Sequence, residues 1–103
     1  GQYARAAEAL KAAIAIEPEN AVAHCNLGEI YKHLNLMDDA IRELEVAKGL
    51  DPDFADTYIN LGIIYDDYAV NDQKALEHYR RYQSLGGSDP QVADWIKAIE
   101  RGS

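Results

Sequence analysis

The sequence predicts an all-α fold of six helices arranged as stacked hairpins. Two observations predict it. The stretch Asn26–Tyr31 (NLGEIY) returns as Asn60–Tyr65 (NLGIIY), 34 residues further on (60 − 26 = 34), and a fixed period of this length is typical of helical repeat proteins. Apolar residues elsewhere recur at the three- and four-residue spacing of a helix face, and no segment alternates as a strand does.

The repeat extends beyond this stretch. Four more pairs of identical residues have the same offset: Ala6 and Ala40, Leu10 and Leu44, Ala13 and Ala47, and Pro18 and Pro52. A duplicated unit of this kind folds as a supersecondary structure that packs against its copy, so we expect an array of helix hairpins.

The first two helices are expected over residues 2–16 and 21–34. The first is rich in Ala, the residue with the highest helix propensity, and Pro18 ends it because proline lacks the amide proton that a helix needs. The second carries the first copy of the repeated stretch. Asn35 is expected to end it, because Asn tolerates the left-handed backbone conformation that follows many helices.

The third helix is expected over residues 39–50, with Asp38 as its N-terminal cap and Pro52 after its end. The fourth, over residues 55–68, repeats the second. These two helices therefore belong to successive copies of the hairpin.

One residue is inserted in the turn at residues 69–72, since the matching alanines Ala40 and Ala75 are 35 residues apart (75 − 40 = 35). The fifth helix is expected over residues 73–85. It ends at Gly86, which begins a Gly-Gly pair and is a strong stop signal.

The sixth helix is expected over residues 90–101, with Asp89 as its cap and a proline at its first position. Trp95 lies on its apolar face and is expected in the core. Tyr82, on the helix before it, is bulky where the earlier copies have Ala, so we expect the sixth helix to dock differently from a regular next repeat.

The composition disfavours several partners. A net charge of −8, from 18 acidic and 10 basic residues, argues against nucleic acid, because phosphate contacts need clustered Lys and Arg. No apolar run approaches the roughly 20 residues that span a bilayer. The single cysteine, Cys25, permits no internal disulfide and fits a reducing, cytoplasmic location. Gly1 begins no signal peptide, and we expect the native N-terminus to lie upstream.

With these residues, the chain resembles the tetratricopeptide repeat family, whose repeat is a helix hairpin with the pattern W-x2-L-G-x2-Y, A-x3-F and P. The central copy reads His24, Leu27, Gly28, Tyr31, Ala40, Leu44, Ala47 and Pro52, and the next reads Tyr58, Leu61, Gly62, Tyr65, Ala75 and Tyr79. The resemblance implies a right-handed α-solenoid. It divides the chain into a partial repeat at residues 1–20, complete repeats at 21–54 and 55–88, and a C-terminal capping helix at 89–103.

Family members bind peptide or helical segments of partner proteins on a concave surface lined by the front helix of each hairpin. The resemblance therefore implies a protein-interaction module. The candidate contact residues are Val22, Cys25, Asn26, Glu29, His33, Asp56, Ile59, Asn60, Ile63 and Asp67. Asn26 and Asn60 are the strongest candidates, because an amide offers both a donor and an acceptor to an extended backbone. The alternative is that both are simply surface residues of the family pattern.

One subclass of the family binds C-terminal carboxylates through Lys and Arg on the front helices. The corresponding positions here are Cys25, Glu29 and Asp56, and none of them is basic. The resemblance therefore favours a basic or apolar partner segment over an acidic one. The alternative for these acidic residues, together with Asp66 and Asp67, is a solvated acidic face.

Catalysis is not predicted. His24 and Cys25 are adjacent, so a helix points their side chains about 100° apart, and no acidic residue stands at a spacing that would orient the histidine. His24 lies on the packing stripe and is expected to be a core or half-buried histidine. His33 and His78 have no metal-ligand spacing around them, so neither a metal site nor a cofactor is expected.

The second hypothesis is self-assembly. Without a front helix before it, the helix at residues 2–16 would leave uncovered an apolar strip formed by residues such as Ala6, Leu10 and Ile14. A second copy of the chain would cover this strip and build a scaffold through repeat packing between chains. Mutating Asn26 and Asn60 together separates the hypotheses, because partner capture should fall while the oligomer mass stays unchanged.

Overall fold

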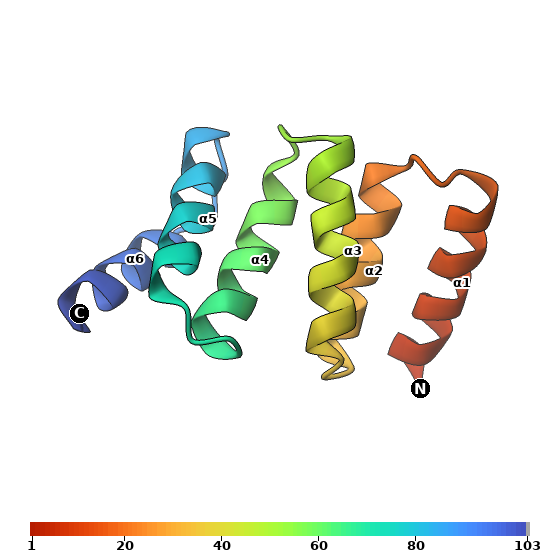
Figure 1. Ribbon diagram of the computed structural model, residues 1–103, viewed down its shortest axis with the longest axis horizontal. Coiled ribbons are helices and arrows are strands. Elements are labelled where there is room, and N and C mark those ends of the chain that lie inside the picture. The colour runs from red at the N-terminus through yellow and green to blue at the C-terminus, as the bar shows by residue number, and fades with distance from the viewer. Residues whose placement is uncertain (103) are drawn as a thin grey trace. The chain divides into compact units, whose positions relative to one another are not determined.

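The computed structural model describes residues 1–102, and within this range it contains six α-helices and no strand. The helices are α1 (Gln2–Ile16), α2 (Ala21–His33), α3 (Met37–Leu50), α4 (Ala55–Asp67), α5 (Asp72–Ser84) and α6 (Gln91–Gly102) (Figure 1). They belong to two compact units, Gly1–Pro52 and Asp53–Ser103. The predicted all-α fold is confirmed. Ser103, the last residue of the predicted capping segment, lies outside the described residues.

In the first unit, α2 and α3 form the most closely packed pair, and α1 packs against α2 (Figure 1). Ala40, Leu44 and Ala47 of α3 are fully buried. Gly28 of α2 faces them so closely that an added Cβ atom would lie 2.6 Å from Leu44 Cγ. The close approach of the two helices therefore requires a glycine at this position.

The second unit contains the same kind of hairpin, formed by α4 and α5. Gly62 of α4 lies against the ring of Tyr79, where an added Cβ atom would be 2.5 Å from Tyr79 Cδ1. Tyr79 is buried and its ring also packs on Trp95 of α6, with 5.5 Å between ring centroids. Trp95 itself is half-buried, so it is less enclosed than the core residue that the sequence predicts.

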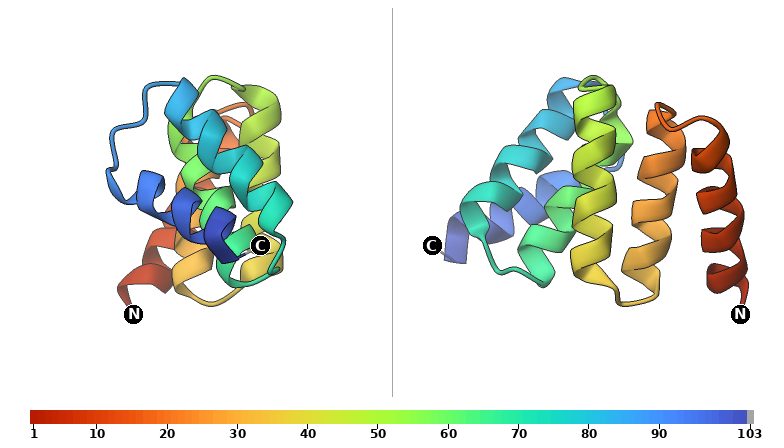
Figure 2. Two further views of the ribbon diagram at one scale, coloured as in Figure 1. Left: turned by 90° about the vertical axis from the view of Figure 1, so that its left-hand side faces the viewer. Right: turned by 45° about the vertical axis from the view of Figure 1, so that its right-hand side comes forward.

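Helix α6 crosses α5 instead of running antiparallel beside it (Figure 2). Tyr82 of α5 is buried and holds the connection between the two helices. Its hydroxyl accepts a hydrogen bond from the Asp89 amide at 2.9 Å, and a Cβ atom on Gly87 would lie 2.3 Å from Tyr82 Cζ. Tyr82 is larger than the alanines at the matching positions of the earlier copies, and its ring and hydroxyl contact the segment that connects α5 to α6.

The turn between α2 and α3 is closed by Asn35, whose φ of 62° is left-handed, as predicted. The Asn35 amide donates to Lys32 O at 3.0 Å, and the Leu36 amide donates to Tyr31 O at 2.8 Å. These two bonds satisfy the last carbonyls of α2 and end the helix.

The turn between α4 and α5 is one residue longer. Here the Asn71 amide donates to Tyr65 O at 2.7 Å, six positions back instead of five. Val70 has a φ of 49°, which is unusual for a β-branched residue. The extra residue of the second copy is accommodated in this turn.

The starts of α3 and α5 lie before the predicted positions. Helix α3 begins at Met37, two residues before the expected start, and Asp38 does not cap it. Asp38 lies inside the first turn, where its charge is favourable near the positive end of the helix dipole. Helix α5 begins at Asp72 instead of residue 73, and Asn71 caps it by accepting a backbone hydrogen bond at 3.1 Å.

The end of α5 and the start of α6 follow the prediction closely. Gly86 has a left-handed φ of 86° directly after the C-terminal cap of α5. Asp89 Oδ1 accepts a hydrogen bond from the Gln91 amide at 2.9 Å, at the start of α6. The stop and start signals were therefore correct, and the helix begins one residue later than expected.

Candidate functional site

On α2, the residues Val22, Asn26, Glu29 and His33 recur every three or four positions and form one face of the helix, called here the α2 stripe. All four side chains are exposed. His33 is held at one end of the stripe by Tyr3 of α1, whose ring is stacked on it at 4.7 Å and is inclined by only 6°. The stripe presents an apolar group, an amide, a carboxylate and an aromatic ring in order.

Cys25 does not belong to this exposed face. Its side chain is 1% exposed, so the sequence-based assignment of Cys25 to the contact surface is wrong. Successive residues of a helix are turned by about 100°, which moves Cys25 from the exposed face beside Asn26 into the packed one. A signal was present in the residue type, since Cys is among the residues most often buried.

On α4, the corresponding face consists of Asp56, Ile59, Ile63 and Asp67, called here the α4 stripe. The two aspartates are exposed at its ends, and the two isoleucines are half-buried between them. This face is therefore apolar in the middle and acidic at both ends. Neither the α4 stripe nor the α2 stripe contains Lys or Arg.

Asn60 requires a second correction. Its side chain is 6% exposed, and its amide nitrogen donates to the Asp56 carbonyl of the same helix at 3.0 Å. Asn26, its partner in the repeat, is exposed. The prediction that both amides face a binding partner is therefore wrong for Asn60, because exposure depends on the surroundings of each copy and not on the shared residue type.

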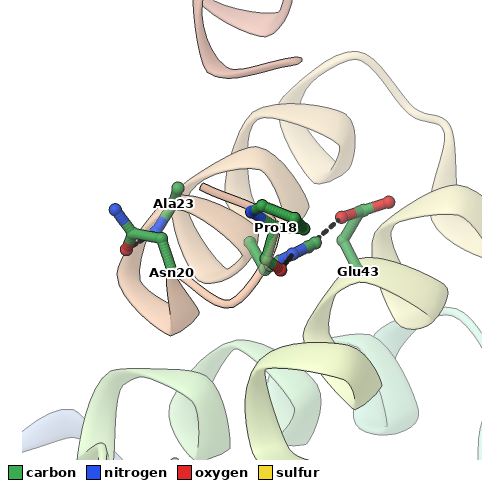
Figure 3. A network of polar contacts seen from close by, with 5 residues as sticks. Pro18, Asn20, Ala23 and Glu43 are labelled. Carbon is green, nitrogen blue, oxygen red and sulfur yellow. Dashed lines mark hydrogen bonds and ion pairs between the residues drawn. The ribbon is translucent and has the colours of Figure 1, made fainter. Parts of the chain in front are cut away.

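His24 of α2 is buried and has a polar partner at each ring nitrogen. Nε2 donates to the Pro18 carbonyl at 2.8 Å, and Nδ1 lies 2.7 Å from Glu43 Oε1. Figure 3 shows this network, with Pro18 on the connection before α2 and Glu43 on α3. His24 thus joins three segments of the first unit, and the predicted core histidine is confirmed.

The expectation that no acidic residue orients His24 is wrong. Glu43 is 19 positions away and reaches the imidazole only because the hairpin brings α3 beside α2. No local spacing in the sequence marks this pair. Since both ring nitrogens are engaged and the adjacent Cys25 is buried, the geometry is that of a structural histidine.

Asp66 and Tyr79 form a polar contact between α4 and α5. The Tyr79 hydroxyl donates to Asp66 Oδ2 at 3.1 Å. Burial raises the pKa of Tyr79 far above its usual range, and the charge of Asp66 adds to this effect, so the phenol remains the donor. Burial also raises the pKa of Asp66, while the hydrogen bond from Tyr79 lowers it and the charges of Asp67 and Asp72 raise it.

Within residues 1–102, no group of three or more His, Cys, Asp or Glu side chains is placed to hold a metal ion. His78 is buried, donates from Nδ1 to the Lys74 carbonyl at 2.7 Å and lies 5.3 Å from the ring of Tyr65. No helix in the described part of the chain is long and apolar enough to cross a membrane.

Comparison with known proteins adds a family and two similar folds. The family model described as tetratricopeptide repeat matches residues 1–61. The Sgt2 TPR domain from Aspergillus fumigatus is similar at 20% identity and a TM-score of 0.86, over 98% of this chain and 68% of that one. The first TPR of Spaghetti (RPAP3), bound to the HSP90 peptide SRMEEVD, is similar at 19% identity and a TM-score of 0.88, over 99% of this chain and 80% of that one. A comparison with curated protein sequences finds no match.

Proposed function

Since the chain belongs to the tetratricopeptide repeat family, we propose that it is a protein-interaction module that binds a basic or apolar segment of a partner protein. The family and the fold both fit such a module. One observation favours a basic or apolar partner segment over an acidic one. The α2 and α4 stripes present acidic and apolar side chains and no Lys or Arg. Each stripe by itself favours a basic segment over an acidic one.

The α4 stripe supplies two kinds of contact. Ile59 and Ile63 offer apolar surface, and Asp56 and Asp67 stand at its ends, where they can pair with Lys or Arg of the partner. Exposed ion pairs contribute only about 0.2–1 kcal/mol each, but they speed association and disfavour partners of the wrong charge. The apolar centre therefore supplies most of the affinity and the acidic ends most of the selectivity.

The α2 stripe contributes a different contact. Asn26 is exposed in its middle and can both donate to and accept from the backbone of an extended segment. Glu29 gives the α2 stripe an exposed carboxylate of its own. Asn60 has no part in this proposal because it is buried.

The ligand of one similar structure provides a matched probe. The first TPR of Spaghetti is bound to SRMEEVD, a peptide with an acidic end. At the positions that carry basic residues in carboxylate-binding members, this chain has Cys25, which is buried, and Glu29 and Asp56, which are exposed acids. We expect no measurable binding of SRMEEVD to this chain, because neither stripe presents a Lys or Arg to its carboxylates.

Random-peptide phage display on the immobilised chain tests the proposal. The enriched peptides should be basic or apolar. Their affinity, measured by fluorescence anisotropy, should fall by about tenfold or more in the variant Asp56→Lys/Asp67→Lys, because both ends of the α4 stripe then repel a basic segment. Asp94→Lys changes an exposed aspartate of α6 outside both stripes, and this control should keep the affinity within about twofold.

Enrichment of acidic peptides, or equal losses in the stripe variant and the control, would contradict the proposal. The two asparagines sharpen the test. Asn26→Ala should weaken peptide binding without a change in melting temperature, because its side chain is exposed. Asn60→Ala should mainly lower the melting temperature, because the Asn60 side chain is buried.

Self-association through α1 is the second candidate function. Ala6, Leu10 and Ile14 are half-buried, and Ile16 at the end of the helix is 82% exposed. A second copy that covers the Ala6, Leu10 and Ile14 strip together with the exposed Ile16 would join chains into a scaffold. Light scattering should then show a mass that rises with concentration and returns to the monomer in Ile16→Glu; a constant monomeric mass at millimolar protein would contradict it.

The proposed mechanism is binding by shape and side-chain complementarity, with no chemical step. Both ring nitrogens of His24 are occupied by structural hydrogen bonds, so this imidazole is not presented to a substrate. The one cysteine, Cys25, is a buried thiol outside any disulfide, which suits a reducing compartment such as the cytoplasm.

A further inference from the structure

A hollow of about 260 Å³ opens in the second unit beside α6, and it is distinct from both stripes. Three helices contribute to its lining: Asp66 comes from α4, Asp72 from α5, and Trp95, Ala98, Ile99 and Gly102 from α6. All of these residues belong to one compact unit. The hollow therefore has apolar and aromatic walls together with two carboxylates.

The size of the hollow favours a single side chain as its occupant. Small-molecule pockets usually have volumes of about 300–1,000 Å³, so this one is below that range. One water molecule occupies about 30 Å³ in the liquid, so the hollow is also much larger than a site for one ordered water. A long amino-acid side chain lies between these limits.

The aromatic wall suits a cation. Trp95 is held in place by Tyr79, whose ring lies 5.5 Å away and is itself buried beneath the hairpin contact with Gly62. Among aromatic side chains, the indole ring attracts cations most strongly. A wall of this kind also packs well against a flat apolar or delocalised group.

The two carboxylates lack a cationic partner from the chain. Within residues 1–102, no Lys, Arg or His forms a salt bridge with Asp66 or Asp72. Lys74, two positions from Asp72, has its ammonium group 5.2 Å from the centre of the Tyr65 ring, and Arg80 is paired with Glu100. The negative charge of the hollow is therefore left for an outside cation.

The protonation of Asp66 supports this view. Burial raises the pKa of its carboxyl group, and the charges of Asp67 and Asp72 raise it further, against the opposing effect of the hydrogen bond from Tyr79. The ionised form of Asp66 is thus disfavoured by partial burial and by the like charges near it. A cation in the hollow would relieve both effects.

We propose that this hollow binds the side chain of an arginine in the partner segment. The inference deepens the proposed function and rests on it, because it names the basic residue that the module selects. A guanidinium group is planar and stacks on an indole, while its N–H groups donate to carboxylates in a fixed fork. Lysine carries the same charge but has neither the plane nor the fork.

Trp95 is the only tryptophan of the chain, so its indole N–H gives one NMR signal that reports on the hollow. We would titrate isotope-labelled protein with N-acetyl-L-arginine amide, N-acetyl-L-lysine amide and N-acetyl-L-norleucine amide. The arginine probe should shift the Trp95 signal saturably at millimolar concentration. The lysine probe should bind more weakly, and the norleucine probe about tenfold more weakly than arginine, since it has no charge.

Three variants complete the test. Asp66→Asn/Asp72→Asn should weaken the arginine probe by about tenfold, whereas Glu77→Gln, at an exposed position of α5 outside both the lining and the stripes, should leave it within about twofold. Ala98→Leu keeps both carboxylates and fills the hollow, so it should abolish the shift. Equal affinity for norleucine, or full arginine binding in either hollow variant, would overturn the proposal. These probes do not need the α2 and α4 stripes, so a failure here is separable from a failure of the phage-display test.

Discussion

The α2–α3 and α4–α5 hairpins are copies of one unit, yet different side chains hold them together. Both place a glycine of the first helix against a large side chain of the second, Gly28 against Leu44 and Gly62 against Tyr79. The backbones therefore approach each other by the same device. An aliphatic side chain fills the contact in the first hairpin, and an aromatic ring with a polar end fills it in the second.

The polar positions differ more. In the first hairpin His24 is hydrogen-bonded to Glu43 at 2.7 Å. The matching residues of the second are Tyr58 and His78, whose rings lie 6.0 Å apart. A hydrogen bond to a carboxylate is replaced by an aromatic contact at the same place. The two copies of the repeat therefore keep the same spacing between their helices, while the side chains that fill the space between them differ.

Replacing Gly28 or Gly62 by alanine should destabilise the hairpin that contains it, and this is the largest effect on stability that we expect. Gly62→Ala sets a methyl group against the buried Tyr79 ring, and Gly28→Ala sets one against Leu44 Cγ. Each should lower the free energy of unfolding by about 1–3 kcal/mol. Gly62→Ala should cost more, because a ring cannot yield as a leucine side chain can. Urea unfolding followed by circular dichroism measures both losses.

The matched control for this prediction is Gly49→Ala. Gly49 lies in α3, and an added Cβ atom there has no neighbouring atom within 4 Å. The substitution should raise the free energy of unfolding by up to about 1 kcal/mol, through helix propensity alone. A loss at Gly49 equal to that at Gly62 would show that packing against Tyr79 is not the cause.

Removing Glu43 should test the polar contact that only the first hairpin has. Glu43→Ala leaves Nδ1 of the buried His24 without its partner and should cost about 1–3 kcal/mol in urea unfolding. Glu45→Ala, two positions along α3, breaks the contact of Glu45 with Lys48 at 3.0 Å in a more exposed place and should cost less than about 1 kcal/mol. Equal losses would mean that the His24 contact adds nothing to stability.

A substitution at Thr57 should stabilise the second hairpin. Thr57 corresponds to Ala23 of the first copy, and its Oγ1 is a buried oxygen that, in the described part of the chain, has no hydrogen-bond partner. Thr57→Val keeps the shape, removes the unpaired hydroxyl and should raise the free energy of unfolding by about 1 kcal/mol. Thr57→Ser, which keeps the hydroxyl and loses the methyl group, should instead lower the melting temperature.

Replacing Asp66 should have the smallest effect on stability, and this effect should appear only as a change in how stability depends on pH. Asp66 stands where the first copy has Lys32. Because its folded pKa is raised, the folded state holds this proton more tightly, so its contribution to stability falls as the pH rises from the unfolded value of about 4 through the folded value. Asp66→Asn keeps an acceptor for Tyr79 and removes this fall.

The measurement is the melting temperature of Asp66→Asn minus that of the unmodified chain, across the acid range. This difference should become more positive as the pH rises. Asp67→Asn removes one of the charges that raise the pKa of Asp66, so it should show the same trend at a smaller size. A difference for Asp66→Asn that stays constant with pH would mean that its carboxyl group titrates alike in the folded and unfolded chain.

Predictions from the sequence succeeded where one segment contains the whole cause. Asn35 and Gly86 end their helices through their own backbone conformation, and Asp89 marks a helix start through a bond two residues away. The prediction for Asp38 failed because helix α3 already begins at Met37, so a residue with capping chemistry lies inside the first turn. Local signals thus locate an end to within a residue or two.

The candidate surface was predicted less completely. Four of the predicted contact residues, Val22, Asn26, Glu29 and His33, form one exposed face of α2. The same predicted set includes Cys25 and Asn60, and both are buried. The repeat itself misled at Asn60, because identical residues in two copies do not have identical neighbours.

The amino-acid sequence alone determined six helices and their approximate ends. These features follow from local backbone conformation and from the 34-residue repeat that relates Asn26 to Asn60 (60 − 26 = 34). Only the tertiary structure decided that Glu43 would hold His24, that Asn60 would be buried while Asn26 is not, and that α4, α5 and α6 would enclose a hollow with two carboxylates and a tryptophan. Burial and pairing depend on side chains that folding brings together from distant segments, and no local spacing records them.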